Sequence, residues 1–508
     1  MRVRPCLVAL ASIVSAACGS APPPPPAAPP SVTAATPVTA SAAASAVPAA
    51  ASAPSAESLV PLPPLPPDVA DLQRAVLASR GAVDTVSSLT TEVGARLAGS
   101  PADKLAVAWA IHAMEERGLT NVHAEPVKVP TWQRGVETAA IVSPTPHVLA
   151  VAALGWSGAT PPKGVEAEVV RFDSLDALKN ADAKTVTGKI AFIDVKMERT
   201  SSGKGYGDAV PARGAGPAEA KKKGALALVI RSIGTDHSRF PHTGSSKQKD
   251  AKTALPAAAL SVADAELLDR EIAAHSKVRL ALNLGPKWLP ESDSANVVGE
   301  VAGSEKPGEV VVLGAHLDSW DLGQGAIDDG AGCGIVLEAG RAIAALGHKP
   351  RRTVRVVLFA AEENSLAGGT TYAKTHAADA ASIVAALEAD SGTDRVLAAR
   401  YTGAKDARAR FAALGPLLAP LGVKVEDSAA LGGADVSPLR GLGVPVIDLE
   451  QDFSSYFDTH HTANDTFERV NPEGIQQAAA AFATTAWAVA NMDGDFGRVP
   501  EAERASRF

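Results

Sequence analysis

Short, almost wholly apolar runs alternate with helical patterns in the C-terminal part of the chain, and this alternation most constrains its fold. The runs lie at residues 310–314, 354–359, 383–387 and 444–449. The helical patterns lie at residues 334–345, 368–377, 407–418 and 476–490. Buried strands alternating with helices predict an α/β fold with a mostly parallel, doubly wound mixed sheet covered on both faces. Ligands of such sheets bind beyond the carboxyl ends of the strands.

The N-terminal 68 residues differ from the rest of the chain. Residues 1–18 combine arginines, a short apolar run and small residues, which predicts a secretory signal peptide too short to span a bilayer. The small residues before Cys18 resemble a bacterial lipoprotein processing box, so lipidation of Cys18 and plain cleavage both fit. Residues 19–68 are mostly Ala, Pro, Ser, Thr and Val, which predicts a disordered tether. We therefore expect an exported protein that is extracellular, periplasmic or lipid-anchored.

Charge and cysteine content exclude several classes of protein. The chain has 48 basic and 56 acidic residues and a formal charge of −8, which argues against nucleic-acid binding. Of its three cysteines only Cys333 lies beyond residue 18, so the body of the chain has no disulfide framework or cysteine-ligated zinc site. A metal would need His, Asp and Glu ligands. Cys333 lies among small residues and is interpreted as a buried, inert thiol.

The pattern predicts a module inserted at residues 128–288 between two parts of one domain, 69–127 and 289–492, with a C-terminal tail at 493–508. Within the insert, strand-like runs lie at residues 166–172, 189–195, 226–230 and 277–284, and a helix is expected at 216–223. Amphipathic helices are expected at residues 69–77 and 104–117.

Acidic and histidine residues recur at or after the predicted strands. They are His316, Asp318, Asp328, Asp329, Glu362, Glu363, Glu388 and Asp390, followed later by His460 and His461. Each taken alone is ordinary, because an acidic pair often begins a solvated helix and a His pair can lie at the surface. Their recurrence at buried strand ends, where charges are costly unless paired or bound to a metal, predicts a metal site.

Five segments resemble the superfamily of co-catalytic zinc aminopeptidases and glutamate carboxypeptidases, most closely its plasma glutamate carboxypeptidase branch. They are HAEPVKVPTWQRG (123–135), GAHLDSWDLGQGAIDDG (314–330), FAAEEN (359–364), EADSGT (388–393) and YFDTHHTANDT (456–466). In the insert, GKIAFIDV, GPAEAKKKGALALVI and LPAAALSVADAELL resemble a protease-associated domain. The resemblance implies the zinc exopeptidase fold with a β-rich protease-associated insert that acts as a lid, spacer or substrate gate.

The same resemblance implies two zinc ions and assigns their ligands. These would be His316, Asp328, Glu363, Asp390 and His461, with Asp328 bridging both ions and His460 as the alternative to His461. Glu362 would be the general base, and Asp318 would support catalysis by orienting His316. Zinc accepts imidazole and carboxylate ligands, and two zinc ions lower the pKa of a shared water. The implied reaction is attack of a metal-bridged hydroxide on a peptide carbonyl.

The implied function is a secreted or lipid-anchored dizinc exopeptidase that hydrolyses dipeptides or N-terminal residues of short peptides. A true carboxypeptidase, a non-catalytic binding protein and another reaction on this scaffold, such as glutaminyl cyclisation, stay open. The expected partners are short peptides, no nucleic acid, and a membrane only through a lipid on Cys18. Relatives in this superfamily often form homodimers, so a homodimer is expected from the resemblance alone.

For two further residues, the sequence allows two different roles. Asp435 lies where the superfamily has a Gly-x-Asp stretch near the pocket, but an acidic residue there also fits a helix N-cap. Tyr456 fits either an oxyanion contact or a packing role.

Overall fold

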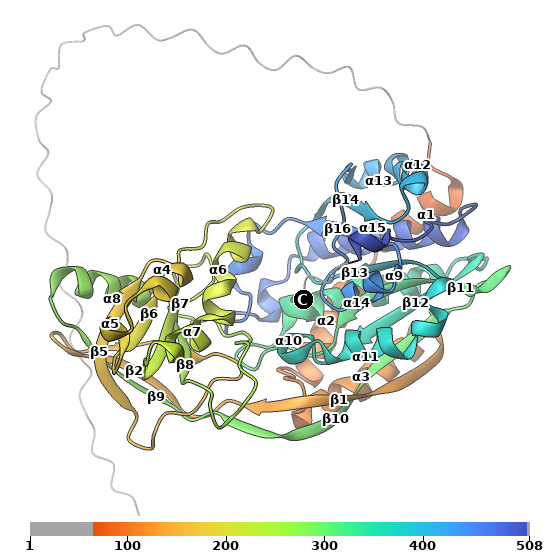
Figure 1. The fold of residues 1–508 in the computed structure, drawn as a ribbon. Coiled ribbons are helices and arrows are strands. Elements are labelled where there is room, and N and C mark those ends of the chain that lie inside the picture. Colours follow the sequence, from red (N-terminus) through yellow and green to blue (C-terminus); the bar gives the residue numbers. More distant parts are fainter. Residues whose placement is uncertain (1–63, 505–508) are drawn as a thin grey trace, which may run out of the picture. The chain divides into compact units, whose positions relative to one another are not determined.

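The computed structural model describes residues 64–504. The predictions for residues 1–18, for Cys18 and for most of residues 19–68 therefore lie outside the described residues. The first described helix, α1 (Pro67–Ala78), begins at the end of the predicted tether (Figure 1). Within residues 64–504, no helix has the length and apolar character needed to cross a bilayer.

The first of two eight-stranded sheets has the order β1-β10-β12-β11-β13-β16-β14-β15 (Figure 1). Its strands are β1 (Thr120–Gln133), β10 (Lys287–Val301), β11 (Lys306–His316), β12 (Arg352–Phe359), β13 (Ile383–Glu388), β14 (Val396–Thr402), β15 (Lys424–Val425) and β16 (Val446–Gln451). The central strands β12, β11, β13 and β16 are parallel, as predicted. The pairings β1–β10, β10–β12 and β14–β16 are antiparallel, so the sheet as a whole is mixed.

Helices cover both faces of this sheet, which explains the continuous apolar runs. On one face lie α1, α2 (Gly81–Glu92), α3 (Pro101–Glu116), α9 (Ala331–Ala344) and α15 (Pro472–Asn491), and on the other α11 (Ala367–Thr375) and α14 (Ser437–Gly441). Along β11, Val311 and Leu313 pack on the first face, whereas Val310 and Val312 pack on the second. The doubly wound arrangement was therefore predicted correctly.

The helix predicted at residues 407–418 is broken. The chain forms α12 (Arg408–Ala412) and then α13 (Gly415–Leu418), with Pro416 in the first turn of the second helix. Proline has no N–H to donate inside a helix and its ring clashes with the preceding turn, so the two short helices cannot continue as one.

A second eight-stranded sheet, of order β3-β2-β9-β5-β6-β7-β8-β4, lies within the predicted insert. Its strands are β2 (Glu137–Ser143), β3 (His147–Leu149), β4 (Val151–Ala153), β5 (Val165–Phe172), β6 (Ile190–Ile193), β7 (Ala227–Arg231), β8 (Ala257–Leu260) and β9 (Arg279–Leu284). Helix α8 (Val262–Ala274) packs on one face. The other face packs against α4 (Leu175–Asn180), α5 (Ala183–Val186), α6 (Lys204–Gly214) and α7 (Gly216–Lys222). The insert thus contains an eight-stranded sheet with helices on both faces.

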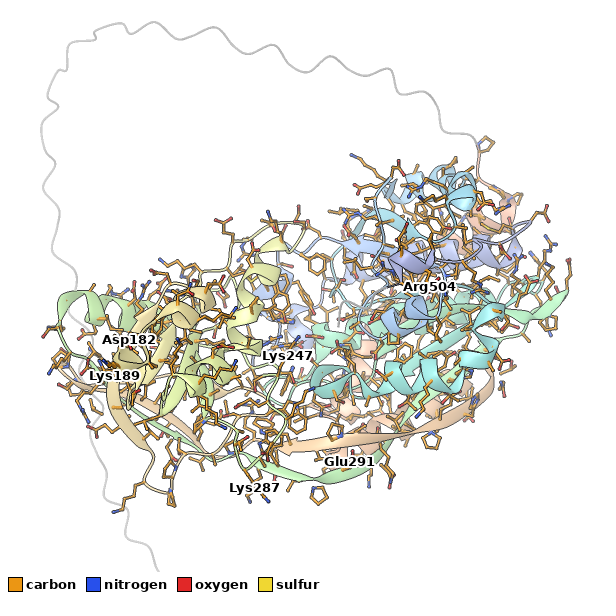
Figure 2. The ribbon with its side chains drawn as sticks, in the orientation of Figure 1. Asp182, Lys189, Lys247, Lys287, Glu291 and Arg504 are labelled. Atoms are coloured by element: carbon orange, nitrogen blue, oxygen red, sulfur yellow. The ribbon has the colours of Figure 1, made fainter. Side chains whose placement is uncertain are left out.

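Strands β1 and β10 connect the two sheets. They pair antiparallel along their length, from Thr120 opposite Glu300 to Gln133 opposite Lys287. Lys287 and Glu291, labelled in Figure 2, lie on the part of β10 that precedes its pairing with β12, which begins at Val297. The insert boundary predicted at residue 128 falls inside β1, because this strand stays paired with β10 to Gln133 and the second sheet begins at Glu137.

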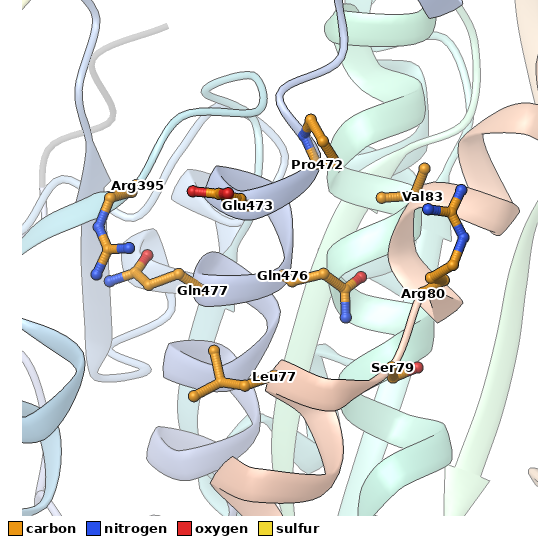
Figure 3. Close-up of a pocket in the computed structure, with 9 residues that line it drawn as sticks. All are labelled: Leu77, Ser79, Arg80, Val83, Arg395, Pro472, Glu473, Gln476 and Gln477. Atoms are coloured by element: carbon orange, nitrogen blue, oxygen red, sulfur yellow. The ribbon is translucent and has the colours of Figure 1, made fainter.

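Two buried glutamines hold the start of α15 in place beside a surface pocket of about 310 Å³ (Figure 3). Gln476 accepts a hydrogen bond from Ala82 N at 3.1 Å and donates to Val76 O at 2.7 Å. Gln477 accepts from Val396 N at 2.8 Å and donates to the carbonyls of Val396 and Leu421. Buried amides are stable only when so satisfied, so these residues fix α15 against α1, α2 and β14.

Candidate metal centre

The segments that follow the central parallel strands carry the predicted site residues. His316 ends β11, and Asp328 lies in the turn Ala326–Gly330 that precedes α9, where its own backbone angles are not helical. Glu362 and Glu363 begin α10 (Glu362–Ser365), immediately after β12. Asp390 follows β13, and His461 lies beyond the short 3-10 helix Tyr456–Asp458. Because β11, β12 and β13 are parallel neighbours, their carboxyl ends bring these side chains to one edge of the sheet.

Asp328 lies at the centre of the group and presents its two carboxylate oxygens to different partners. Its Oδ1 is 3.1 Å from His316 Nε2, which is also 3.6 Å from Asp390 Oδ1. Its Oδ2 is 3.2 Å from His461 Nε2, which is also 3.0 Å from Glu363 Oε2. The five side chains thus form two sets, His316 with Asp390 and His461 with Glu363, which share the carboxylate of Asp328.

These residues fit a pair of bound cations. Asp328 Oδ2 and Glu363 Oε1 are buried without a hydrogen-bond partner among residues 64–504. Burial raises the pKa of Glu363 and of Asp390, because each carboxylate loses hydration. Buried carboxylates of this kind are stable when paired or bound to metal, and carboxylate oxygen with imidazole nitrogen is a donor set that suits zinc.

Asp318 connects His316 with Glu362. Its backbone carbonyl lies 3.0 Å from His316 Nδ1, which leaves Nε2 facing Asp328 and Asp390. Its Oδ1 lies 3.6 Å from the same Nδ1 and accepts a hydrogen bond from Glu362 N at 2.9 Å. Glu362 stays partly exposed, while burial among its neighbours raises its pKa well above the usual range. Asp318 therefore orients a predicted ligand and the predicted base together.

The loop that carries Asp328 is held by two residues that the sequence analysis did not single out. Asp465 accepts hydrogen bonds from Ile327 N at 2.6 Å and Asp328 N at 3.3 Å. The buried guanidinium of Arg96 donates to the carbonyls of Leu317, Gln324 and Gly325. Asp465 lies in the YFDTHHTANDT segment, but its role follows only from these contacts.

The insert also reaches the site, through residues that the sequence analysis did not assign. The carbonyl of Thr243 lies 3.4 Å from His461 Nδ1, and Arg213 Nη1 lies 3.3 Å from the same nitrogen. Arg213 Nη2 donates to Tyr206 Oη at 2.7 Å. Arg213 is 7% exposed, its guanidinium contacts Thr243 O, His461 Nδ1 and Tyr206 Oη but no carboxylate within the described chain, and its Nε has no hydrogen-bond partner there.

The remaining predicted residues have clear positions. His460 stacks on His461 with 3.5 Å between ring centroids, and its Nε2 is 3.6 Å from Asp328 Oδ2. His461 is nearer to Asp328 and also meets Glu363, which favours it over His460 as a ligand. The Asp328–Asp329 peptide bond is cis. Asp329 accepts hydrogen bonds from His316 N and Gly332 N. It therefore holds the backbone of His316 against the start of α9.

Asp435, Tyr456 and Cys333, whose roles were also predicted from the sequence, are all buried. Asp435 accepts from Gly369 N at 3.0 Å, so it caps the first turn of α11 rather than α14, the helix that follows it in sequence. Tyr456 packs with Ile327 and Phe457. Cys333 is buried, and burial raises the pKa of its thiol to about 12, in agreement with an inert thiol.

A glycine packed behind the ligands gives a first prediction. A Cβ added at Gly332 would lie 2.0 Å from the carbonyl oxygen of Ala389 and 2.3 Å from Asp329 Oδ2. We expect Gly332→Ala to destabilise the fold by about 1–3 kcal/mol, because backbone atoms beside Asp390 must shift. Calorimetry should show a lower melting temperature than the wild type. Gly347→Ala is the control, since its Cβ would meet no atom within 4 Å, and an equal loss in both variants would contradict the prediction.

Comparison with known proteins identifies the family. Residues 296–486 match the sequence profile of peptidase family M28. Carboxypeptidase Q of Mus musculus is 38% identical over 406 residues, covering 80% of this chain and 84% of the mouse protein. The chain belongs to peptidase family M28. Carboxypeptidase Q of Homo sapiens is 36% identical over 416 residues, covering 82% and 86% of the two chains.

Solved structures agree with the M28 assignment. A peptidase M28 precursor from Shewanella amazonensis is 47% identical and superposes with a TM-score of 0.84, covering 85% of this chain and 98% of that one. A zinc aminopeptidase from Bacillus subtilis, at 19% identity and a TM-score of 0.60, shares the fold over 83% and 97% of the two chains. This M28 chain is therefore a metallopeptidase similar to carboxypeptidase Q.

Proposed function

We propose that this chain is a dizinc exopeptidase that hydrolyses dipeptides or N-terminal residues of short peptides. The observation that carries the proposal is the position of Asp328, whose two oxygens face two separate sets of ligand residues. His316 and Asp390 would hold one zinc ion, His461 and Glu363 the other, and Asp328 both. When bound, two zinc ions supply Lewis acidity and a water acidic enough to ionise near neutral pH.

The residues around the metals account for the rest of the reaction. Glu362 is partly exposed beside both ligand sets and is positioned by its backbone hydrogen bond to Asp318. We assign it as the general base that takes the proton of the attacking water and then gives it to the leaving amine. His316 Nδ1 is occupied by the Asp318 carbonyl, so its Nε2 is free to act as a ligand.

Arg213 favours substrates with a free carboxylate. A buried guanidinium without an anionic partner is costly, and two zinc ions nearby would add further positive charge. In a dipeptide the terminal carboxylate lies one residue from the scissile carbonyl, which suits a cation in contact with His461. The proposal therefore takes the unblocked dipeptide as the best substrate.

Arg213→Met tests this assignment. We expect kcat/KM on unblocked dipeptides to fall roughly 30- to 1,000-fold, the range expected when one partner of a buried charged pair is lost. Dipeptide amides, which lack the carboxylate, should be poor substrates for wild type and variant alike. Arg213→Lys keeps the charge but loses the forked geometry, so it should recover only part of the activity.

The wild-type assay decides between the proposed specificities. Equal hydrolysis of dipeptides and their amides would contradict carboxylate recognition by Arg213. Cleavage of N-acetylated but not C-amidated dipeptides would instead identify a true carboxypeptidase. An absence of hydrolysis by zinc-loaded protein would contradict the proposed function as a whole.

The proposal includes export of the enzyme, through the signal pattern at residues 1–18 and with or without a lipid on Cys18. Release from cell membranes of a Cys18→Ala variant, but not of the wild type, would support the lipid anchor. A homodimer formed by the peptidase domain stays a prediction from the resemblance.

A further inference from the structure

The two proposed metal positions differ in what holds them. The His316 and Asp390 set is supported by its own domain: Asp318 O meets His316 Nδ1, Asp329 accepts from His316 N, and Ala389 N donates to Gly314 O. The His461 and Glu363 set is instead in contact with the insert. Thr243 O, an insert atom, lies at His461 Nδ1, and Trp156 Nε1 donates to Asn364 O, next to Glu363.

The loop that carries His461, residues 452–462, is tied to the insert along its length. Backbone bonds join Phe453 N to Ser201 O at 3.0 Å and Thr235 N to Phe457 O at 3.1 Å. A third joins Thr243 N to His461 O at 2.9 Å. The His461 loop therefore pairs with the insert at its beginning, middle and end.

One ion pair reinforces these backbone contacts. Arg199 of the insert donates to both oxygens of Asp458, at 2.5 and 2.9 Å, and also to Ser454 O. Thr235 Oγ1 donates to the same carboxylate at 2.7 Å. Exposed ion pairs are usually weak, but a bidentate Arg–carboxylate pair with further hydrogen bonds has a defined geometry. Asp458 lies three residues before His461, so this pair limits where that imidazole can move.

We propose that the insert, through the Arg199–Asp458 pair, positions the His461 loop and thereby sets the zinc affinity of the His461–Glu363 site while leaving the His316–Asp390 site unaffected. The insert is then part of the metal centre's scaffold as well as a cover for it. Arg199 is a positioning residue, since it acts through Asp458 and touches neither the metal ligands nor the proposed substrate position. The inference rests on the proposed dizinc function.

The experiment compares zinc titrations of wild type and Arg199→Ala in the full-length, metal-stripped protein, with a chromophoric chelator as competitor. The wild type should bind two equivalents. In Arg199→Ala one equivalent should weaken roughly 10- to 100-fold and the other by less than about threefold, the range seen when a ligand's supporting contacts are lost. Arg199→Lys should restore part of the affinity, because it keeps the charge without the bidentate contact.

Two controls separate positioning from a general loss of structure. Arg279→Ala removes a similarly exposed ion pair inside the insert, Arg279–Glu166 at 3.1 Å, and should leave both equivalents unchanged. The metal-free Arg199→Ala and Arg279→Ala proteins should melt at the same temperature. Cobalt absorption spectra of Arg199→Ala with one equivalent bound should match those of His461→Ala, which keeps only the His316–Asp390 site.

Three outcomes would overturn the inference. Equal weakening of both equivalents in Arg199→Ala would show a general effect on the fold, and no change in either would show that the pair positions nothing. The same split in Arg279→Ala would show that any damage to the insert has this effect. A wild type that binds fewer than two equivalents would contradict the dizinc proposal itself.

Discussion

Glu362→Gln should abolish most turnover while both zinc ions remain bound. The amide has nearly the same size as the carboxylate but cannot accept the proton of the attacking water, so kcat should fall by roughly 100- to 10,000-fold. The metal ligands are untouched, and the backbone hydrogen bond from residue 362 to Asp318 does not depend on the side chain. Steady-state kinetics on dipeptides and metal analysis by mass spectrometry provide the two measurements.

Glu473→Gln is the matched control. Glu473 is exposed at the start of α15, in the pocket of Figure 3, and contacts none of the predicted ligands. It should retain wild-type kcat. A Glu362→Gln enzyme that worked near the wild-type rate would remove Glu362 as the base. Loss of zinc from that variant would instead place Glu362 among the ligands.

Removal of metal by a chelator should abolish activity and make the stability of the fold depend strongly on pH. Without cations, the buried carboxylates of the site are stable only when protonated. Burial raises the pKa of Glu388 to about 8 and that of Asp465 to about 7, both close to the ligands. A raised pKa means that the folded protein keeps protons that the unfolded chain releases near the ordinary carboxyl pKa values of 4.5 and 3.8. Stability therefore falls as pH rises from there, and this contribution is fully lost above about 7 to 8.

Melting curves of stripped and zinc-loaded protein between pH 5 and pH 9 would measure this effect. The melting temperature of the stripped protein should fall as pH rises to about 8 and then level off, and that of the zinc-loaded protein should fall less, because bound zinc stabilises the ionised carboxylates. Activity should return when zinc is added back. Parallel pH profiles with and without zinc, or full activity after chelation, would contradict the prediction.

The sequence pattern predicted the strands that are continuous apolar runs. It missed elements that form only through pairing or packing with distant parts of the chain. The runs at residues 310–314, 354–359 and 383–387 became β11, β12 and β13, because strands buried on both faces need such runs. The antiparallel strand β10 begins with exposed polar residues and was not predicted. Helix α6 contains Gly205, Gly207 and Pro211, whose low helix propensity is overridden by packing against the second sheet.

The residue types of the candidate metal site could be predicted from the sequence. With Cys333 as the one thiol beyond residue 18, a metal could be bound only by His, Asp and Glu, and these residues follow the parallel strands. The fold then explains why His316, Glu363 and Asp390 meet, since the carboxyl ends of parallel strands share one edge of a sheet.

How these residues are divided and supported depends on contacts between distant parts of the chain. The orientation of Asp328, with one oxygen toward His316 and the other toward His461, depends on the turn held by Asp465 and Arg96. Contacts from the insert, such as Thr243 and Arg213 at His461, join residues more than two hundred positions apart. Such contacts leave no local periodicity, because they arise from the packing of whole layers rather than from the spacing of residues along one strand or helix.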